Sequence, residues 1–133
     1  MIRYVFASIV TGVLFGAMDG IIHGNPLAKR LYAIYEPILK QSIGIVPGII
    51  IDLAYGFAIA GVFLLLKKSL PGESWFLKGL SLSLIIWFFR VVMYVATQWM
   101  MFTIPAQALL YILATGLLEM IILGLICNIL LRR

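Results

Sequence analysis

The stretch PGIIIDLAYGFAIAGVFLLL at residues 47–66 decides the fold class, because Asp52 is its only charged residue. A helix of about 20 apolar residues crosses the roughly 30 Å of hydrocarbon in a bilayer. A strand of a membrane barrel would be shorter and would alternate between apolar and polar side chains. The stretch therefore predicts a transmembrane helix.

Three other apolar runs of similar length occupy residues 4–24, 78–102 and 105–131. The chain of 133 residues is 64% hydrophobic and 11% charged, whereas about a quarter of the residues in a soluble domain are charged. So few polar side chains do not cover the surface of a soluble domain. We therefore predict an all-α integral membrane protein, in which residues 1–133 form a single domain of four transmembrane helices.

The connection between the first two spans begins like a helix, with Asn25 as a typical N-cap and Pro26 in the first turn. Apolar side chains then recur at helical spacing, at Leu27, Leu31, Ile34, Tyr35 and Ile38. This pattern predicts a short amphipathic helix in the membrane interface at about residues 26–38, which Pro37 should kink or end. The third and fourth spans are separated only by residues 103–105, so they should form an antiparallel hairpin.

Lysine and arginine are distributed unevenly over the connections. One side of the predicted topology holds Arg3, Lys67, Lys68, Lys78, Arg132 and Arg133, and the other holds Lys29, Arg30 and Lys40. The positive-inside rule then predicts a cell (inner) membrane protein with both termini in the cytoplasm. The net charge of +5 is explained by topology and by membrane lipids as partners, so we expect no nucleic-acid partner.

Four charged residues lie inside the predicted spans: Asp19, Asp52, Arg90 and Glu119. A charge at the centre of a span costs about 2.5–3.5 kcal/mol on insertion scales, so intramembrane charges are candidates for function. His23 lies near the end of the first span, four residues after Asp19. Residues four apart share one face of a helix.

The hairpin of the third and fourth spans brings polar residues to matching depths. Arg90 lies 14 residues before Ile104, and Glu119 lies 15 residues after it, which places both about 21 Å from the turn. In the same way Tyr94 matches Thr115, and Gln98 matches Tyr111. The register predicts a polar seam with Arg90 paired to Glu119. Such a pair can serve a function or can simply hold the two helices together.

Asp19 and Asp52 lie at similar depths, about 9 Å and 8 Å below the outer ends of their spans. The three intramembrane acids outnumber Arg90, so a carboxyl must be protonated, His23 must be charged, or a cation must bind. An acid that exchanges a proton also suits a proton-coupled transporter or relay. We therefore expect Asp19 and Asp52 to belong to one functional site.

Metal and cofactor chemistry is poorly supported. Asp19, His23, Asp52 and Glu119 include a single histidine and no cysteine, which is a weak ligand set for zinc or copper. No serine stands in a pattern with a histidine and an acid, so no catalytic triad is visible. We expect no metal and no cofactor.

Small residues form stripes on the first two spans. Ser8, Gly12, Gly16, Gly20 and Gly24 recur every four residues, and Gly48, Gly56 and Ala60 flank Asp52. Such stripes allow helix backbones to approach closely. They predict packing of the first span against the second, or alternatively a seam between two copies of the chain.

These patterns favour a polar, acid-rich pocket in the outer half of the membrane that binds or translocates a small cation, a proton or a polar solute. The candidate lining consists of Asp19, His23, Asp52, Arg90, Tyr94, Gln98, Tyr111 and Glu119. One alternative is an assembly or accessory subunit of a larger membrane complex, or a homo-oligomer. Another is a lipid-modifying enzyme with Asp19 or Asp52 as general base and Arg90 holding a phosphate.

Overall fold

The computed structural model describes residues 1–132, which form four long helices and a short helical connection. The elements are α1 (Ile2–Gly24), α2 (Pro26–Leu31), the 3₁₀ helix η1 (Ala33–Ile38), α3 (Ile45–Leu66), α4 (Trp75–Trp87), the π-helical segment η2 (Phe88–Val92), α5 (Met93–Met101) and α6 (Ala106–Leu131). Four stretches are long and apolar enough to span a membrane: Ile2–Gly24, Ile45–Leu66, Trp75–Met101 and Ala106–Leu131. The predicted all-α architecture with four spans is confirmed.

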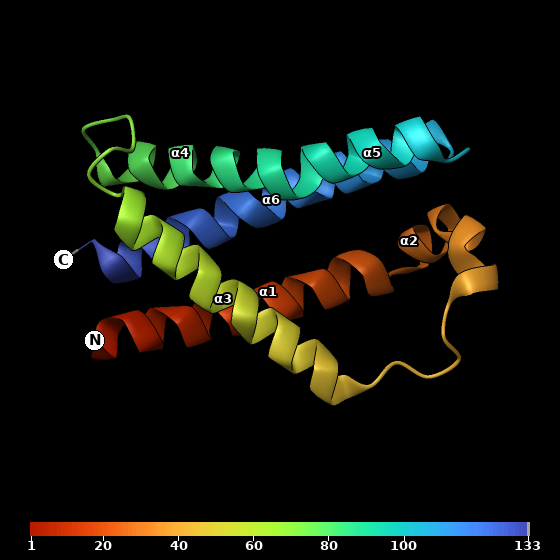
Figure 1. The fold of residues 1–133 in the computed structure, drawn as a ribbon, viewed down its shortest axis with the longest axis horizontal. Helices are drawn as coiled ribbons and strands as arrows, with labels where there is room; N and C mark the ends of the chain where they lie inside the picture. Colours follow the sequence, from red (N-terminus) through yellow and green to blue (C-terminus); the bar gives the residue numbers. More distant parts are fainter. Residues whose placement is uncertain (133) are drawn as a thin grey trace.

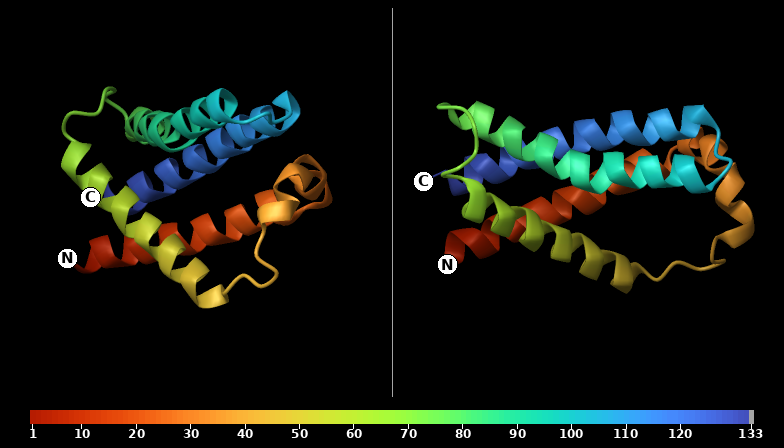
Figure 2. Two further views of the ribbon diagram at one scale, coloured as in Figure 1. Left: turned by 45° about the vertical axis from the view of Figure 1, so that its right-hand side comes forward. Right: turned by 45° about the horizontal axis from the view of Figure 1, so that its top comes forward.

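Helix α6 lies at the centre of the bundle (Figure 1). The continuous rod formed by α4, η2 and α5 runs antiparallel to α6, as the short third connection predicts, and α1 packs against another face of α6. Helix α3 crosses α1 diagonally, and the two helices diverge toward the end of the molecule that carries α2 and η1 (Figure 2). This divergence leaves room beside α1 and α6 at that end.

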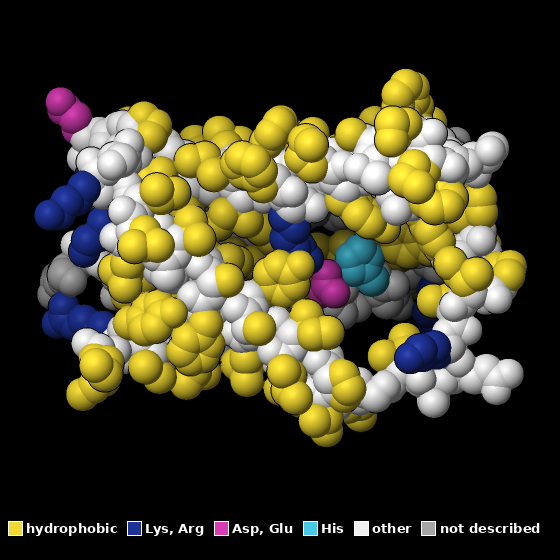
Figure 3. All heavy atoms as spheres, in the orientation of Figure 1, with side chains coloured by type: hydrophobic (Ala, Val, Ile, Leu, Met, Phe, Trp, Pro, Cys, Tyr) yellow, Lys and Arg dark blue, Asp and Glu magenta, His cyan; other side chains and the backbone are white. Residues whose placement is uncertain are grey.

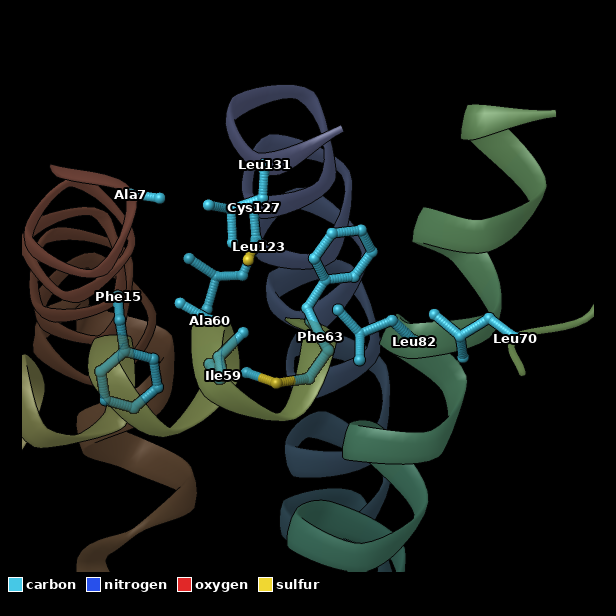
Figure 4. Close-up of a cluster of buried hydrophobic side chains, with 11 residues drawn as sticks. Ala7, Phe15, Ile59, Ala60, Phe63, Leu70, Leu82, Leu123, Cys127 and Leu131 are labelled. Carbon is cyan, nitrogen blue, oxygen red and sulfur yellow. The ribbon is translucent and has the colours of Figure 1, made fainter. Parts of the chain in front are cut away.

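The core lies where α1, α3, α4 and α6 meet (Figure 4). Phe15 from α1, Phe63 from α3, Leu82 from α4 and Leu123 from α6 are all at most 2% exposed. The many other large apolar side chains point outward, which in a soluble protein would be unfavourable but suits a surface that faces lipid.

The two chain ends lie at the same end of the bundle, together with the connection between α3 and α4 (Figure 1). An even number of spans requires this arrangement. The side of the membrane on which this end lies stays a prediction from the distribution of lysine and arginine. Arg133, which contributes to that prediction, lies outside the described residues.

Glycines determine how closely α1 and α3 approach. A Cβ atom added to Gly56 would overlap the Ser8 carbonyl oxygen and the backbone of Gly12, and one added to Gly12 would lie 2.8 Å from the Asp52 carbonyl oxygen. A Cβ on Gly16 would overlap the Asp52 carboxylate. These three glycines therefore serve packing within one chain, which was one of the two predicted roles.

The outer glycines of the two stripes do not take part in this contact. Within residues 1–132, no atom beyond the glycine's own stretch of helix lies within 4 Å of a Cβ added to Gly20, Gly24 or Gly48, because α1 and α3 have already diverged at that level. The packing of α4 on α6 depends on a further pair that the sequence patterns did not reveal. A Cβ on Gly124 would overlap the Ser83 hydroxyl and would lie 2.9 Å from the Gly79 carbonyl oxygen.

The predicted connection helix is present but divided. Asn25 Oδ1 accepts a hydrogen bond from the Ala28 N–H at 2.9 Å, which confirms the N-cap. The α-helix ends at Leu31, and a 3₁₀ helix that contains Pro37 follows. A proline ring clashes with the carbonyl four residues earlier in an α-helix, so the backbone before Pro37 adopts the tighter form.

Asn25 also joins the connection to α6. Its Nδ2 donates to the Ile22 carbonyl oxygen at 2.7 Å and to the Tyr111 hydroxyl at 2.8 Å, and that hydroxyl donates to the Ile22 carbonyl oxygen at 2.5 Å. We expect Tyr111→Phe to lower the free energy of unfolding by about 2 kcal/mol, because the hydroxyl makes two hydrogen bonds and each contributes about 1 kcal/mol net. Denaturation in detergent micelles measures this difference.

A double-mutant cycle provides the control for this junction. Asn25→Ser keeps a capping oxygen but loses the amide donors, so its effect should overlap with that of Tyr111→Phe. If the effects of the two substitutions simply add, Asn25 and Tyr111 do not act together.

Candidate functional site

A cavity of about 950 Å³ lies at the end of the bundle that carries α2 and η1. Its charged and hydroxyl-bearing lining consists of Asp19, His23, Lys29, Tyr32, Tyr35, Glu36, Tyr55, Arg90, Tyr94, Thr115 and Glu119. These side chains come from all four spans and from the connection between α1 and α3. Figure 3 shows the hollow on the side of the bundle, with the single histidine of the chain beside acidic and basic side chains.

Arg90 and Glu119 form an ion pair on the cavity wall. Arg90 Nη1 donates to Glu119 Oε2 at 3.3 Å, which confirms the pairing predicted from the register of the hairpin. The Glu119 side chain is 3% exposed and that of Arg90 is 25% exposed. The second carboxylate oxygen, Glu119 Oε1, is buried and has no hydrogen-bond partner in the described part of the chain.

Two aromatic rings hold the Arg90 guanidinium in place. Its Cζ lies 4.5 Å from the centre of the Phe15 ring on α1 and 4.8 Å from the centre of the Tyr55 ring on α3. Cation–π contacts of this kind are attractive, most strongly where water is scarce. Arg90 is also the central residue of the π-helical segment η2, a departure from regular helix that is frequent at functional sites.

Asp19 and His23 form a second polar pair one turn apart on α1. His23 Nε2 lies 3.2 Å from Asp19 Oδ1, and both side chains are partly exposed to the cavity. The imidazole ring also packs near the Tyr32 ring, with 5.4 Å between the ring centres. Through this ring contact, the pair links α1 to the segment of α2 and η1 that covers the cavity.

Two tyrosines of the connection between α1 and α3, Tyr32 and Tyr35, also line the cavity. Burial raises the pKa of Tyr32 and that of Tyr35, so both hydroxyls stay protonated at neutral pH. Tyr35 Oη donates to Gln98 Oε1 at 3.5 Å. Tyr32 Oη is buried and lacks a hydrogen-bond partner within residues 1–132.

The structure brings five of the eight predicted lining residues to the cavity, namely Asp19, His23, Arg90, Tyr94 and Glu119. Gln98 and Tyr111 instead hold the covering connection against the hairpin. Asp52 is not part of the lining, because its carboxylate lies against Gly16 in the contact between α1 and α3. The structure therefore does not place both aspartates on the cavity wall.

Tyr32 and Tyr35 were not foreseen as site residues. In the sequence Tyr35 fits the apolar face of an amphipathic helix and Tyr32 lies outside that pattern, and nothing marks either hydroxyl as facing a cavity. Tyr55 and Phe15 were missed for a related reason. They belong to apolar runs, and only the crossing of α1 and α3 brings their rings together, with 4.8 Å between the ring centres.

The cavity is suited to a small polar or charged ligand, since it combines carboxylates, one guanidinium and several phenol groups. In the part of the chain that the structure describes, no three His, Cys, Asp or Glu side chains come together as a metal site. The sequence was compared with protein-family models, with curated proteins and with solved structures, and none of the three comparisons found a match.

Proposed function

We propose that this polytopic membrane protein binds a small organic cation, a protonated amine, in the cavity between its spans. One observation supports the proposal most strongly. Within residues 1–132, two buried polar atoms have no hydrogen-bond partner and belong to residues that line this cavity, namely Glu119 Oε1 and Tyr32 Oη. A buried polar atom without a partner is costly. An ammonium group has the N–H donors that both oxygens lack.

The charges of the intramembrane wall support a cationic ligand. Asp19 and Glu119 line the cavity from α1 and α6, and within residues 1–132 Arg90 is the only lysine or arginine that lines it from a span. If both carboxylates are ionised and His23 is neutral, one negative charge is left over. Removing that charge from water without a counter-ion is unfavourable, and a bound ammonium group compensates it.

The aromatic residues of the wall favour an organic cation over a metal ion. Tyr32, Tyr35, Tyr55 and Tyr94 all line the cavity, and aromatic rings attract cations through their π faces. The volume of about 950 Å³ accommodates a drug-sized molecule. Because the hollow opens on the side of the bundle (Figure 3), an amine with an apolar body can reach it from the lipid.

Binding of benzylamine, which is protonated at neutral pH, tests this function. We expect calorimetric titration of the detergent-solubilised protein to detect benzylammonium, with weaker binding of benzyltrimethylammonium, which lacks N–H donors, and little binding of neutral benzyl alcohol. Glu119→Gln and Asp19→Asn should each weaken benzylammonium binding by about tenfold or more, since a hydrogen bond to a charged group contributes about 1.5–3 kcal/mol.

Asp52→Asn is the matched control, because it removes an intramembrane carboxylate that does not line the cavity. Its affinity for benzylammonium should stay within about twofold of the original, which is less than 0.5 kcal/mol. Equal binding of benzyl alcohol and benzylammonium would rule out a cation site. Equal losses from Asp52→Asn and Glu119→Gln would show that binding does not depend on which acid lines the cavity, and would contradict the site described above.

Translocation is a further step that the same proposal includes. Uptake of radiolabelled benzylammonium into vesicles that contain the purified protein separates transport from binding alone. Vesicles without the protein provide the background rate for passive diffusion of the amine, and Glu119→Gln vesicles should take it up more slowly than vesicles with the original protein.

A further inference from the structure

A second cavity, of about 320 Å³, lies at the opposite end of the bundle, beside the end of α6 and the connection between α3 and α4. Four of its lining side chains are cationic: Lys67, Lys68, Lys78 and Arg132. Among residues 1–132, Glu73 is the only acid in the lining, so positive charge predominates there. We call it the basic cavity. Figure 3 shows the lysine and arginine side chains gathered at this end of the molecule.

Hydrogen bonds fix the walls of the basic cavity. Lys78 Nζ donates to the Lys67 carbonyl oxygen at 3.0 Å, which holds the ammonium group at the end of α3. An ammonium group has three N–H donors, so two remain for a ligand. Asn128, which is 2% exposed, donates from Nδ2 to the Trp75 carbonyl oxygen and so ties α6 to the first residue of α4.

Arg132, which lines the basic cavity, makes a cation–π contact with an aromatic ring. Its guanidinium Cζ lies 5.6 Å from the centre of the Trp75 ring. The planar N–H donors of a guanidinium match the oxygens of a phosphate. The N-terminus of α4 lies beside the same cavity, and its first N–H groups add partial positive charge.

We propose that the basic cavity binds the phosphate-bearing headgroup of an anionic membrane lipid. Its position selects a lipid over a dissolved anion. Lys67 directly follows the last residue of α3, and Arg132 directly follows the last residue of α6, so both lie at the depth of the lipid headgroups. Leu65 and Ile129 are exposed just inside the same helix ends, where the acyl chains of a bound lipid run.

This site is independent of the amine cavity, because the two cavities share no lining residue and lie at opposite ends of the bundle. The charge distribution predicts that the basic cavity faces the cytoplasm. The cytoplasmic leaflet is the one whose anionic lipids attract basic segments near the membrane. A lipid held here would stabilise the contact of α3 with the start of α4.

Native mass spectrometry of the protein in detergent tests the lipid site directly. The probes are phosphatidylglycerol, phosphatidylcholine and inorganic phosphate, each titrated separately. We expect phosphatidylglycerol to bind at least about fivefold more tightly than phosphatidylcholine, and inorganic phosphate to bind far more weakly than either lipid. Equal affinities for the two lipids would overturn the proposal. Phosphate that binds as tightly as phosphatidylglycerol would show a site for a dissolved anion instead.

Matched variants separate a site from diffuse attraction. Arg132→Gln should weaken phosphatidylglycerol binding about fivefold, and Lys68→Gln/Arg132→Gln should weaken it further. Both side chains are exposed, so the fold should be preserved. Arg3→Gln removes one positive charge from the same end but outside the lining, and should leave the affinity within about twofold. An equal loss for Arg3→Gln and Arg132→Gln would overturn the proposal.

Discussion

Arg90→Leu should lower the free energy of unfolding by about 3 kcal/mol, because it leaves the Glu119 carboxylate buried without its partner. The double variant Arg90→Leu/Glu119→Leu should be more stable than Arg90→Leu, since it removes both charges from the interior. Denaturant titration of the purified protein in detergent measures both free energies.

The same pair of variants separates stability from function. The double variant should fold but should not bind benzylammonium, because it lacks the carboxylate that we propose as the ligand of the ammonium group. A double variant that is no more stable than Arg90→Leu would show that the two side chains are not energetically paired, despite the 3.3 Å between Nη1 and Oε2.

Gly56→Ala should destabilise the bundle by about 3 kcal/mol, at the upper end of the cost of overpacking. The added methyl group would overlap the Ser8 carbonyl oxygen and the backbone of Gly12, and neither of these backbone groups can rotate away. The helices α1 and α3 would have to separate at their crossing. Thermal unfolding in detergent, followed by circular dichroism, measures the loss.

Gly48→Ala is the control on the same helix, because in the described part of the chain no atom beyond its own stretch of helix lies within 4 Å of the added Cβ. Alanine favours helix over glycine by about 1 kcal/mol, so this substitution should leave the stability unchanged or raise it. If Gly48→Ala destabilises the protein as much as Gly56→Ala, the close approach at Gly56 does not determine how α1 and α3 pack.

The sequence predicts well those features that depend on counting along a helix. The Arg90–Glu119 pair follows from equal distances to the hairpin turn, and the cap at Asn25 follows from local residue preferences. The close contact of α1 with α3 was one of two alternatives that the small-residue stripes predicted, and only Gly12, Gly16 and Gly56 of their glycines take part in it. In each case the relevant neighbours are fixed by helix geometry, before any tertiary packing is known.

Features that depend on the crossing angles of helices were not predictable in this way. Asp19 and Asp52 have matching depths, but depth does not specify the direction in which a side chain points around its helix axis. Asp52 therefore faces Gly16, while Asp19 faces the cavity. Tyr32 belongs to the site because the connection between α1 and α3 folds over the cavity. The spacing of apolar residues in the sequence does not predict how this connection folds.

The proposal of an amine site is tested most directly by anomalous diffraction from crystals grown with 4-bromobenzylamine. The bromine locates the ligand, and the nitrogen position follows from it. We expect the nitrogen to lie within hydrogen-bonding distance, about 3 Å, of Glu119 Oε1, with the ring among the tyrosines that line the cavity. A ligand found elsewhere, with Glu119 Oε1 still lacking a partner in the cavity, would contradict the proposal.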